Sequence, residues 1–178
     1  LLILDGACEN GADIKKIVGL DEVVFDIGVT ANRPDCQSIL GLAREVAAVL
    51  NKPLKMPATD YKTRNFKTSD RVSVEVKDDT LCPRYIACAV DNVRVKQSPE
   101  WIRKRLKSVG INSINNIVDI TNFVLTEIGQ PMHSFDHDLL KGEKLVIRRA
   151  ENGEKITTLD EKEFTLNDSN LVIADGEK

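Results

Sequence analysis

The clearest hydrophobic pattern in the first half of the chain is helical and lies at 38–50, where apolar side chains recur three and four positions apart. Asp35 or Ser38 is the candidate for the N-cap, and Pro53 stands just beyond the end. Earlier in the chain, residues 22–29 form a short run rich in β-branched side chains, and a polar break separates it from the helical pattern. We predict a helix over the 38–50 stretch.

Two further helices are predicted in the second half of the chain. The first, over 98–110, starts at Ser98 and Pro99, which supply an N-cap and a proline for the first turn. The second runs over about 119–128, with Gly129 as its C-terminal stop. The side chains expected to face a core are Ile102, Leu106 and Val109 in the first helix, and Ile120, Phe123, Val124 and Ile128 in the second.

Alternating or β-branched runs predict six strands around these two helices. Two strands precede them, at 71–77 and 84–95. Four short strands follow, separated by Gly, Asn and Asp turns, at 144–150, 154–160, 162–167 and 170–175.

These elements predict an α+β fold in two regions. Residues 52–70 lose all periodicity and contain two prolines, which is typical of a linker. We therefore expect a small partial helical domain at 1–55, a linker at 56–70, and a mixed β domain with two intervening helices at 71–178.

Composition narrows the class of protein. The 178 residues are 42% apolar, enough for a packed core. Asp and Glu (28) outnumber Lys and Arg (25), so the net charge of -3 excludes binding of nucleic acid over the whole surface and leaves only local contacts. No apolar run approaches the roughly 18 residues of a membrane span, and we expect a cytoplasmic protein without a membrane partner. The cysteines, expected to be buried free thiols with zinc or a disulfide as the alternative, are Cys8, Cys36, Cys82 and Cys88.

Positive charge gathers within residues 94–107, where only Glu100 is acidic. The pattern fits either the solvated face of an amphipathic helix or a ridge that contacts the phosphates of a nucleic acid. The basic residues are Arg94, Lys96, Arg103, Lys104, Arg105 and Lys107.

A histidine follows the stop of the last predicted helix. His133 and His137 have the spacing of a helical zinc pair, but Pro131 opposes a helix there and no third ligand is evident. Ser134 and His133 are adjacent, so their side chains point apart, and no GxSxG elbow surrounds the serine. We therefore predict no metal site, and His133 taken alone reads as a turn residue.

Two separated stretches together resemble the β subunit of bacterial phenylalanyl-tRNA synthetase. "VVFDIGVTANRPDCQSILGLAREVAAVL" at 23–50 resembles that family's Asn-Arg-Pro-Asp-Cys segment and the helix after it. "INNIVDITNFVLTEIGQPMHSFD" at 114–136 resembles the core of its tRNA-editing module, in the same order along the chain. The strand entry at 82–85 and the helix start at 98–101 extend the resemblance over nearly the whole chain. It implies a piece of a longer chain: the later part of the first helical domain and most of the editing module, truncated at its C-terminal end.

In that family the editing module hydrolyses tyrosine wrongly attached to the phenylalanine tRNA, and the resemblance implies the same site here. His133 would be catalytic, and the residues expected to bind substrate are Thr121, Asn122, Asn112, Gln130 and Met132. Of these, Asn112 departs from the family, many members of which carry Arg at this position. The family's pocket glutamate, which reads the tyrosine hydroxyl, would lie beyond Lys178.

For the parent enzyme, the resemblance implies a heterotetrameric ligase that attaches phenylalanine to its tRNA with ATP and Mg²⁺. The aminoacylation site would lie largely on a partner α subunit, so no cofactor is expected in this fragment. By itself the fragment is expected neither to aminoacylate nor to edit efficiently. Two alternatives stay open: a catalytically silent scaffold that contacts tRNA, and a free-standing editing protein, against which the match at 23–50 argues.

Overall fold

The computed structural model describes residues 4, 8–18 and 21–177, and it divides into two compact units. Unit 1 comprises Leu1–Ala58 and Arg94–Ser134, and unit 2 comprises Thr59–Val93 and Phe135–Lys178. The chain therefore leaves unit 1 and returns to it before completing unit 2. Residues 94–134 group with Leu1–Ala58 in unit 1, and the domain bounds expected from the sequence stay a prediction.

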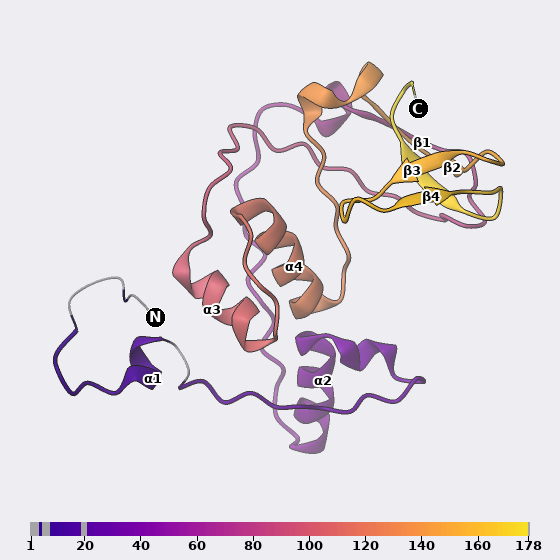
Figure 1. Ribbon diagram of the computed structural model, residues 1–178. Coiled ribbons are helices and arrows are strands. Elements are labelled where there is room, and N and C mark those ends of the chain that lie inside the picture. Colours follow the sequence, from indigo (N-terminus) through magenta and orange to yellow (C-terminus); the bar gives the residue numbers. More distant parts are fainter. Residues whose placement is uncertain (1–3, 5–7, 19–20, 178) are drawn as a thin grey trace. The chain divides into compact units, whose positions relative to one another are not determined.

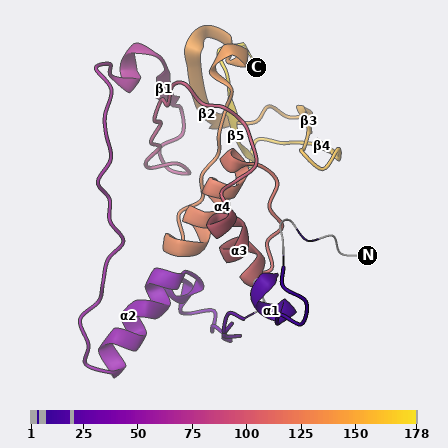
Figure 2. The ribbon, with the colours of Figure 1, turned by 90° about the vertical axis from the view of Figure 1, so that its left-hand side faces the viewer.

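Unit 1 is helical within the described residues. Its helices are α1 (Ile14–Ile17), α2 (Ile39–Val49), α3 (Glu100–Ser108) and α4 (Asn116–Ile128). Helix α4 packs against both α3 and α2, and Figures 1 and 2 show α3 and α4 side by side. The rings of Trp101 and Phe123 make a T-shaped contact in this helix pair, with ring centroids 5.4 Å apart.

Local hydrogen bonds explain where the helices begin and end. The Ser38 hydroxyl accepts from the Gly41 N–H at 3.0 Å, so Ser38 and not Asp35 caps α2. Helix α4 starts three residues earlier than expected, because Asn115 caps it by accepting from the N–H groups of Ile117 and Val118. Gly129, with a φ of 79°, ends α4 as predicted.

Unit 2 contains a three-stranded sheet and a hairpin. Its strands are β1 (Ser73–Val76), β2 (Lys144–Arg149), β3 (Lys155–Thr157), β4 (Glu163–Thr165) and β5 (Leu171–Ala174). Strand β2 is central: it pairs with β1 in parallel and with β5 antiparallel, while β3 and β4 pair antiparallel with each other. Unit 2 also contains short 3₁₀ turns at Thr68–Asp70, His137–Leu139 and Lys141–Glu143, and unit 1 contains one at Pro34–Gln37.

Each unit has a small core. The buried apolar side chains of unit 1 are Cys36, Ile102 and Leu106, and those of unit 2 are Leu145, Val146, Ile147 and Ala150. Three of the latter are consecutive in β2, as expected for a central strand covered on both faces. The expected mixed α and β structure is confirmed, with α3 and α4 lying between β1 and β2 in the sequence.

The predicted strand at 84–95 is wrong, because this run has no regular secondary structure and belongs to no sheet. The Ala89 N–H donates to the Thr68 hydroxyl at 3.3 Å and not to a neighbouring strand. Ile86 and Val90 stay 72% and 74% exposed. A segment with a strand-like sequence forms a strand only where a neighbouring strand pairs with it through backbone hydrogen bonds. The local sequence does not show whether such a neighbour is present.

Several expected burial patterns also fail. Ile102 and Leu106 are buried as predicted, whereas Val109, Ile120 and Ile128 are exposed. Of the cysteines only Cys36 is buried, and Cys8 and Cys88 are exposed. Ser98 does not cap α3, since Pro99 holds the N-cap position.

No helix among the described residues is long and apolar enough to cross a membrane.

Candidate functional site

All the site residues predicted from the sequence lie in the second segment of unit 1, between Arg94 and Ser134. They fall on four parts of this segment: the approach to α3, helix α3, the loop 110–115, and α4 with the residues that follow it. The predicted site residues thus lie on one continuous stretch of chain, within which α3 packs on α4.

Thr121 and Asn122 are half-buried on α4. The Thr121 hydroxyl donates to the Val118 carbonyl at 2.8 Å, one turn earlier in the helix. The Asn122 carbonyl accepts from the Thr126 hydroxyl at 2.9 Å. The Thr121 hydroxyl keeps its acceptor lone pairs for a ligand, so it can accept a hydrogen bond while donating to the backbone.

The remaining predicted substrate residues are exposed. Asn112 lies in the loop between α3 and α4, while Gln130, Met132 and His133 lie in the irregular segment after α4. The Gln130 amide donates to the adjacent Pro131 carbonyl at 3.0 Å. Because His133 is outside any helix, the helical zinc spacing considered for it and His137 does not apply.

A pocket of about 360 Å³ opens beside these residues but is lined by others. Its lining residues are Pro34, Gln37, Val109, Ile111, Leu125, Thr126 and Gly129. Several are sequence neighbours of predicted site residues: Ile111 precedes Asn112, and Gly129 precedes Gln130. The predicted set is therefore not gathered into this pocket.

Asp119, in the first turn of α4, is a buried polar residue near the site that was not among the predicted site residues. It is 0% exposed. Its Oδ2 accepts from the hydroxyls of Ser98 and Ser113 at 2.5 Å each, and its Oδ1 accepts from the Ile114 N–H at 2.8 Å. One signal in the sequence could have found it: Asp119 stands four positions before Phe123, so the two lie on the same face of the helix. A charged residue on an apolar face is buried only where other groups hydrogen-bond to it.

Two opposing effects set the charge state of Asp119. Burial by itself would raise the pKa of this carboxyl. The hydrogen bonds from Ser113, Ser98 and Ile114, with the positive charge of Arg103, outweigh burial and hold the pKa below its ordinary value. Asp119 is therefore a carboxylate at neutral pH, held by three donors.

The basic residues divide into paired and unpaired sets. Lys104 lies 2.8 Å from Glu100, and Arg105 lies 3.8 Å from Glu22. No ion pair of the described residues involves the other four, which are Arg94, Lys96, Arg103 and Lys107. Paired cations are partly neutralised, so the second set is better suited to meet phosphate.

The start of α4 holds the backbone of Arg94 and Lys96, which carry two of the unpaired cations. The Lys96 N–H donates to the Asn116 side-chain oxygen at 2.9 Å, and the Asn116 N–H donates to the Lys96 carbonyl at 2.8 Å. The Asn116 side-chain amide also donates to the Arg94 carbonyl at 3.1 Å. These bonds attach the approach to α3, with its two cations, to the first turn of α4.

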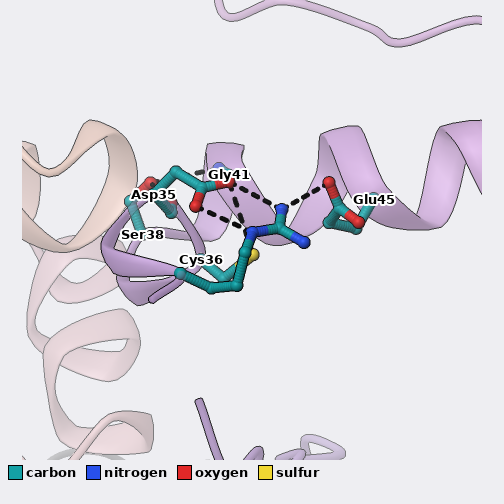
Figure 3. A network of polar contacts seen from close by, with 6 residues as sticks. Asp35, Cys36, Ser38, Gly41 and Glu45 are labelled. Carbon is teal, nitrogen blue, oxygen red and sulfur yellow. Dashed lines mark hydrogen bonds and ion pairs between the residues drawn. The ribbon is translucent and has the colours of Figure 1, made fainter. Parts of the chain in front are cut away.

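The Asn-Arg-Pro-Asp-Cys segment forms a second polar cluster in unit 1 (Figure 3). Arg33 donates to both carboxylate oxygens of Asp35, at 3.0 and 2.8 Å, and to Glu45 of α2 at 2.6 Å. The hydrogen bond from Arg33 lowers the pKa of Asp35 to about 2 and also lowers that of Glu45. The cluster attaches the 3₁₀ turn Pro34–Gln37 to α2.

Ligand atoms of Asp35, Cys36 and Glu45 lie within 4.8 Å of one another, close enough to hold a metal ion. However, the Arg33 guanidinium already satisfies both carboxylates, and burial raises the pKa of the Cys36 thiol, which disfavours the thiolate that binds metals. The chemistry of this donor set favours an ion-pair network over a metal centre.

Comparison with known proteins gives one family and a consistent set of relatives. The model of the B3/4 domain family matches residues 81–178. The chain is 49% identical over 181 residues to the phenylalanine–tRNA ligase beta subunit of Clostridium acetobutylicum, and 46% identical over 179 residues to that of Clostridium tetani. Each alignment covers 100% of this chain but only 22% of the relative. The resemblance stated from the two sequence stretches is confirmed.

Proposed function

Since this chain belongs to the B3/4 domain family, we propose that it forms part of a phenylalanine–tRNA ligase β subunit and hydrolyses tyrosine wrongly attached to the phenylalanine tRNA. The observation that carries the proposal is the 49% identity to such a subunit over the full length of the chain. The match extends over both the 23–50 stretch and the 114–136 stretch, which disfavours a free-standing editing protein.

A ligase for phenylalanine needs a second, hydrolytic site for a physical reason. An apolar pocket shaped for phenylalanine rejects an isostere with one extra hydroxyl only weakly, by a factor of order a hundred. A separate site that hydrogen-bonds the phenol selects the error, because phenylalanine would leave its buried polar groups unpaired.

Hydrolysis of the ester requires an oriented water, a stabilised oxyanion and a proton for the departing ribose oxygen. We assign His133 to orient the water or the ribose hydroxyl, which its exposure supports. Thr121 and Asn122 would hold the aminoacyl end, and Asn112, Gln130 and Met132 would contact the substrate. Asn112 offers a neutral amide where many family members carry a cation, so its contact would be a hydrogen bond and not an ion pair.

We assign contact with the tRNA backbone to the basic residues of the 94–107 segment. The unpaired cations Arg94, Lys96, Arg103 and Lys107 would carry most of it, and Lys104 less, because Glu100 already pairs with Lys104. The complete ligase would act in the cytoplasm with an α subunit, as a heterotetramer, and would use ATP and Mg²⁺ for aminoacylation.

The test of this function is deacylation of tyrosyl-tRNA by the complete ligase carrying His133→Ala. We expect hydrolysis to slow roughly 100-fold, the lower range for loss of a positioned acid–base group. His137→Ala is the matched control, since His137 is an exposed histidine whose Nε2 lies 2.9 Å from the Arg71 carbonyl in unit 2. The His137→Ala ligase should hydrolyse tyrosyl-tRNA at the rate of the unchanged enzyme.

A second candidate is a catalytically silent scaffold that contacts tRNA. The absence of the predicted site residues from the lining of the 360 Å³ pocket favours it. Failure of the unchanged ligase to clear tyrosyl-tRNA faster than spontaneous hydrolysis would favour the scaffold and reject the editing proposal. Clearance that His133→Ala leaves unchanged would reject the catalytic role of His133.

A further inference from the structure

The loop 110–115, which joins α3 to α4 and carries Asn112, is fixed at both ends by backbone geometry. At its start, the Ile111 N–H donates to the Leu106 carbonyl at 2.9 Å and the Gly110 N–H donates to the Lys107 carbonyl at 3.1 Å. With Gly110 at a φ of 80°, these bonds form a Schellman motif. At its end, Asn115 caps α4.

The middle of the loop is held by Asp119. Both Ser113, through its hydroxyl, and Ile114, through its N–H, donate to this carboxylate. The carboxylate is fully buried and also accepts from Ser98, immediately before α3. Hydrogen bonds to a buried charged acceptor are the stronger kind, so this attachment restrains the loop more than a surface turn would.

We propose that Asp119 and Ser113 are positioning residues, which fix the loop 110–115 so that Asn112 meets the substrate in one geometry. The proposal rests on the function proposed above, in which Asn112 contacts the aminoacyl-tRNA. Neither residue touches the substrate; each acts through Asn112.

The physical advantage is preorganisation. Asn112 is exposed, and the hydrogen bonds that restrain this part of the loop belong to its neighbours. Residues on both sides of it, Ile111 and Ser113, are hydrogen-bonded to fixed elements. Substrate binding then avoids the entropy loss of ordering the loop. A long arginine side chain could reach the substrate from a mobile loop, whereas the short amide of Asn112 makes its contact only if the loop is held in place.

The test compares Ser113→Ala with Ser98→Ala in the complete ligase. Both substitutions remove a hydroxyl that donates to Asp119 Oδ2 at 2.5 Å, and Ser98 is the more buried of the two, so Ser98→Ala should lower stability at least as much as Ser113→Ala. Only Ser113→Ala removes a bond that holds the loop itself, which leaves the Ile114 N–H as the remaining donor from the loop to Asp119. We expect it to lower kcat/KM for tyrosyl-tRNA hydrolysis on the order of tenfold, mainly through KM, and Ser113→Thr to restore most of the loss. Ser98→Ala should leave kcat/KM nearly unchanged.

Equal effects of Ser113→Ala and Ser98→Ala on hydrolysis, or no effect of either, would overturn the positioning role while leaving the editing function intact. Should the unchanged ligase fail to hydrolyse tyrosyl-tRNA, the proposed function falls and a second measurement decides the inference. Backbone ¹⁵N relaxation of this chain should show Asn112 becoming mobile on the nanosecond timescale in Ser113→Ala and not in Ser98→Ala. An Asn112 amide equally rigid in both variants would reject the restraint itself.

Discussion

At the scale of single residues, two positions are decided by contacts that no local pattern reveals. Asp119 is a carboxylate that is fully buried on α4, and its burial is tolerated because three donors surround it. Gly41, in the first turn of α2, lies against the preceding 3₁₀ turn: a Cβ built there would stand 1.7 Å from the Asp35 carbonyl oxygen.

Gly41→Ala is therefore expected to destabilise unit 1 strongly. The clash involves backbone on both sides, so α2 or the Pro34–Gln37 turn must move, at a cost of about 3 kcal/mol, the upper end for overpacking. Urea unfolding followed by the fluorescence of Trp101, the single tryptophan of the chain, measures the change. Gly28→Ala is the control, since a Cβ at Gly28 meets nothing within 4 Å; equal midpoints for the two variants would contradict the expectation.

At the scale of elements, an ion pair attaches β2 to the turn before β3. Arg148 of β2 donates to both carboxylate oxygens of Glu154, at 2.8 and 2.9 Å, and Glu154 also accepts from the Glu151 N–H at 2.8 Å. The bonds from Arg148, followed by the bond from Glu151, lower the pKa of Glu154 to about 2. A carboxyl with a lowered pKa stabilises the fold above its unfolded pKa, and this contribution disappears as pH falls through the folded pKa.

We expect Glu154→Gln to be less stable than the unchanged chain at pH 7, and the two to converge as pH falls from about 4.5 to about 2. Urea unfolding monitored by NMR signals of β2 and β5, repeated across this pH range, gives the comparison. Glu163→Gln on β4, where the carboxylate side chain is exposed, serves as control. A stability difference that stays constant between pH 7 and pH 2 would contradict the assigned role of the pair.

At the scale of the whole molecule, stability depends on two small cores. Leu106 of α3 and Ile147 of β2 are the large apolar side chains buried most completely, each 1% exposed, and they lie in different units. Many other large apolar side chains of the described residues are exposed, so each core has little apolar burial in reserve.

Leu106→Ala and Ile147→Ala should each lower the free energy of unfolding of their own unit by about 2–5 kcal/mol, the usual range for truncation in a core. Trp101 fluorescence follows unit 1, and NMR signals of the sheet follow unit 2. Leu159→Ala, at a position 97% exposed, should change stability by less than about 0.5 kcal/mol. Core variants as stable as Leu159→Ala would show that these two side chains do not form the cores.

The sequence by itself determined the elements whose signals are local. Helix α2, the stop of α4 at Gly129, and the strands β2 to β5 between turn residues were predicted because a few neighbouring side chains suffice to favour them. For the cap of α2 the sequence offered Asp35 or Ser38, and the structure decided for Ser38. The two resembling stretches also located the candidate site residues, whose roles stay predictions.

Only the tertiary structure decided which segments meet. The parallel pairing of β1 with β2, the grouping of residues 94–134 with the N-terminal helices, the unpaired run at 84–95 and the burial of Asp119 all depend on residues far apart in the chain. Periodicity and capping describe neighbours along the chain, whereas strand partners and buried hydrogen bonds are selected by packing, which no local window contains.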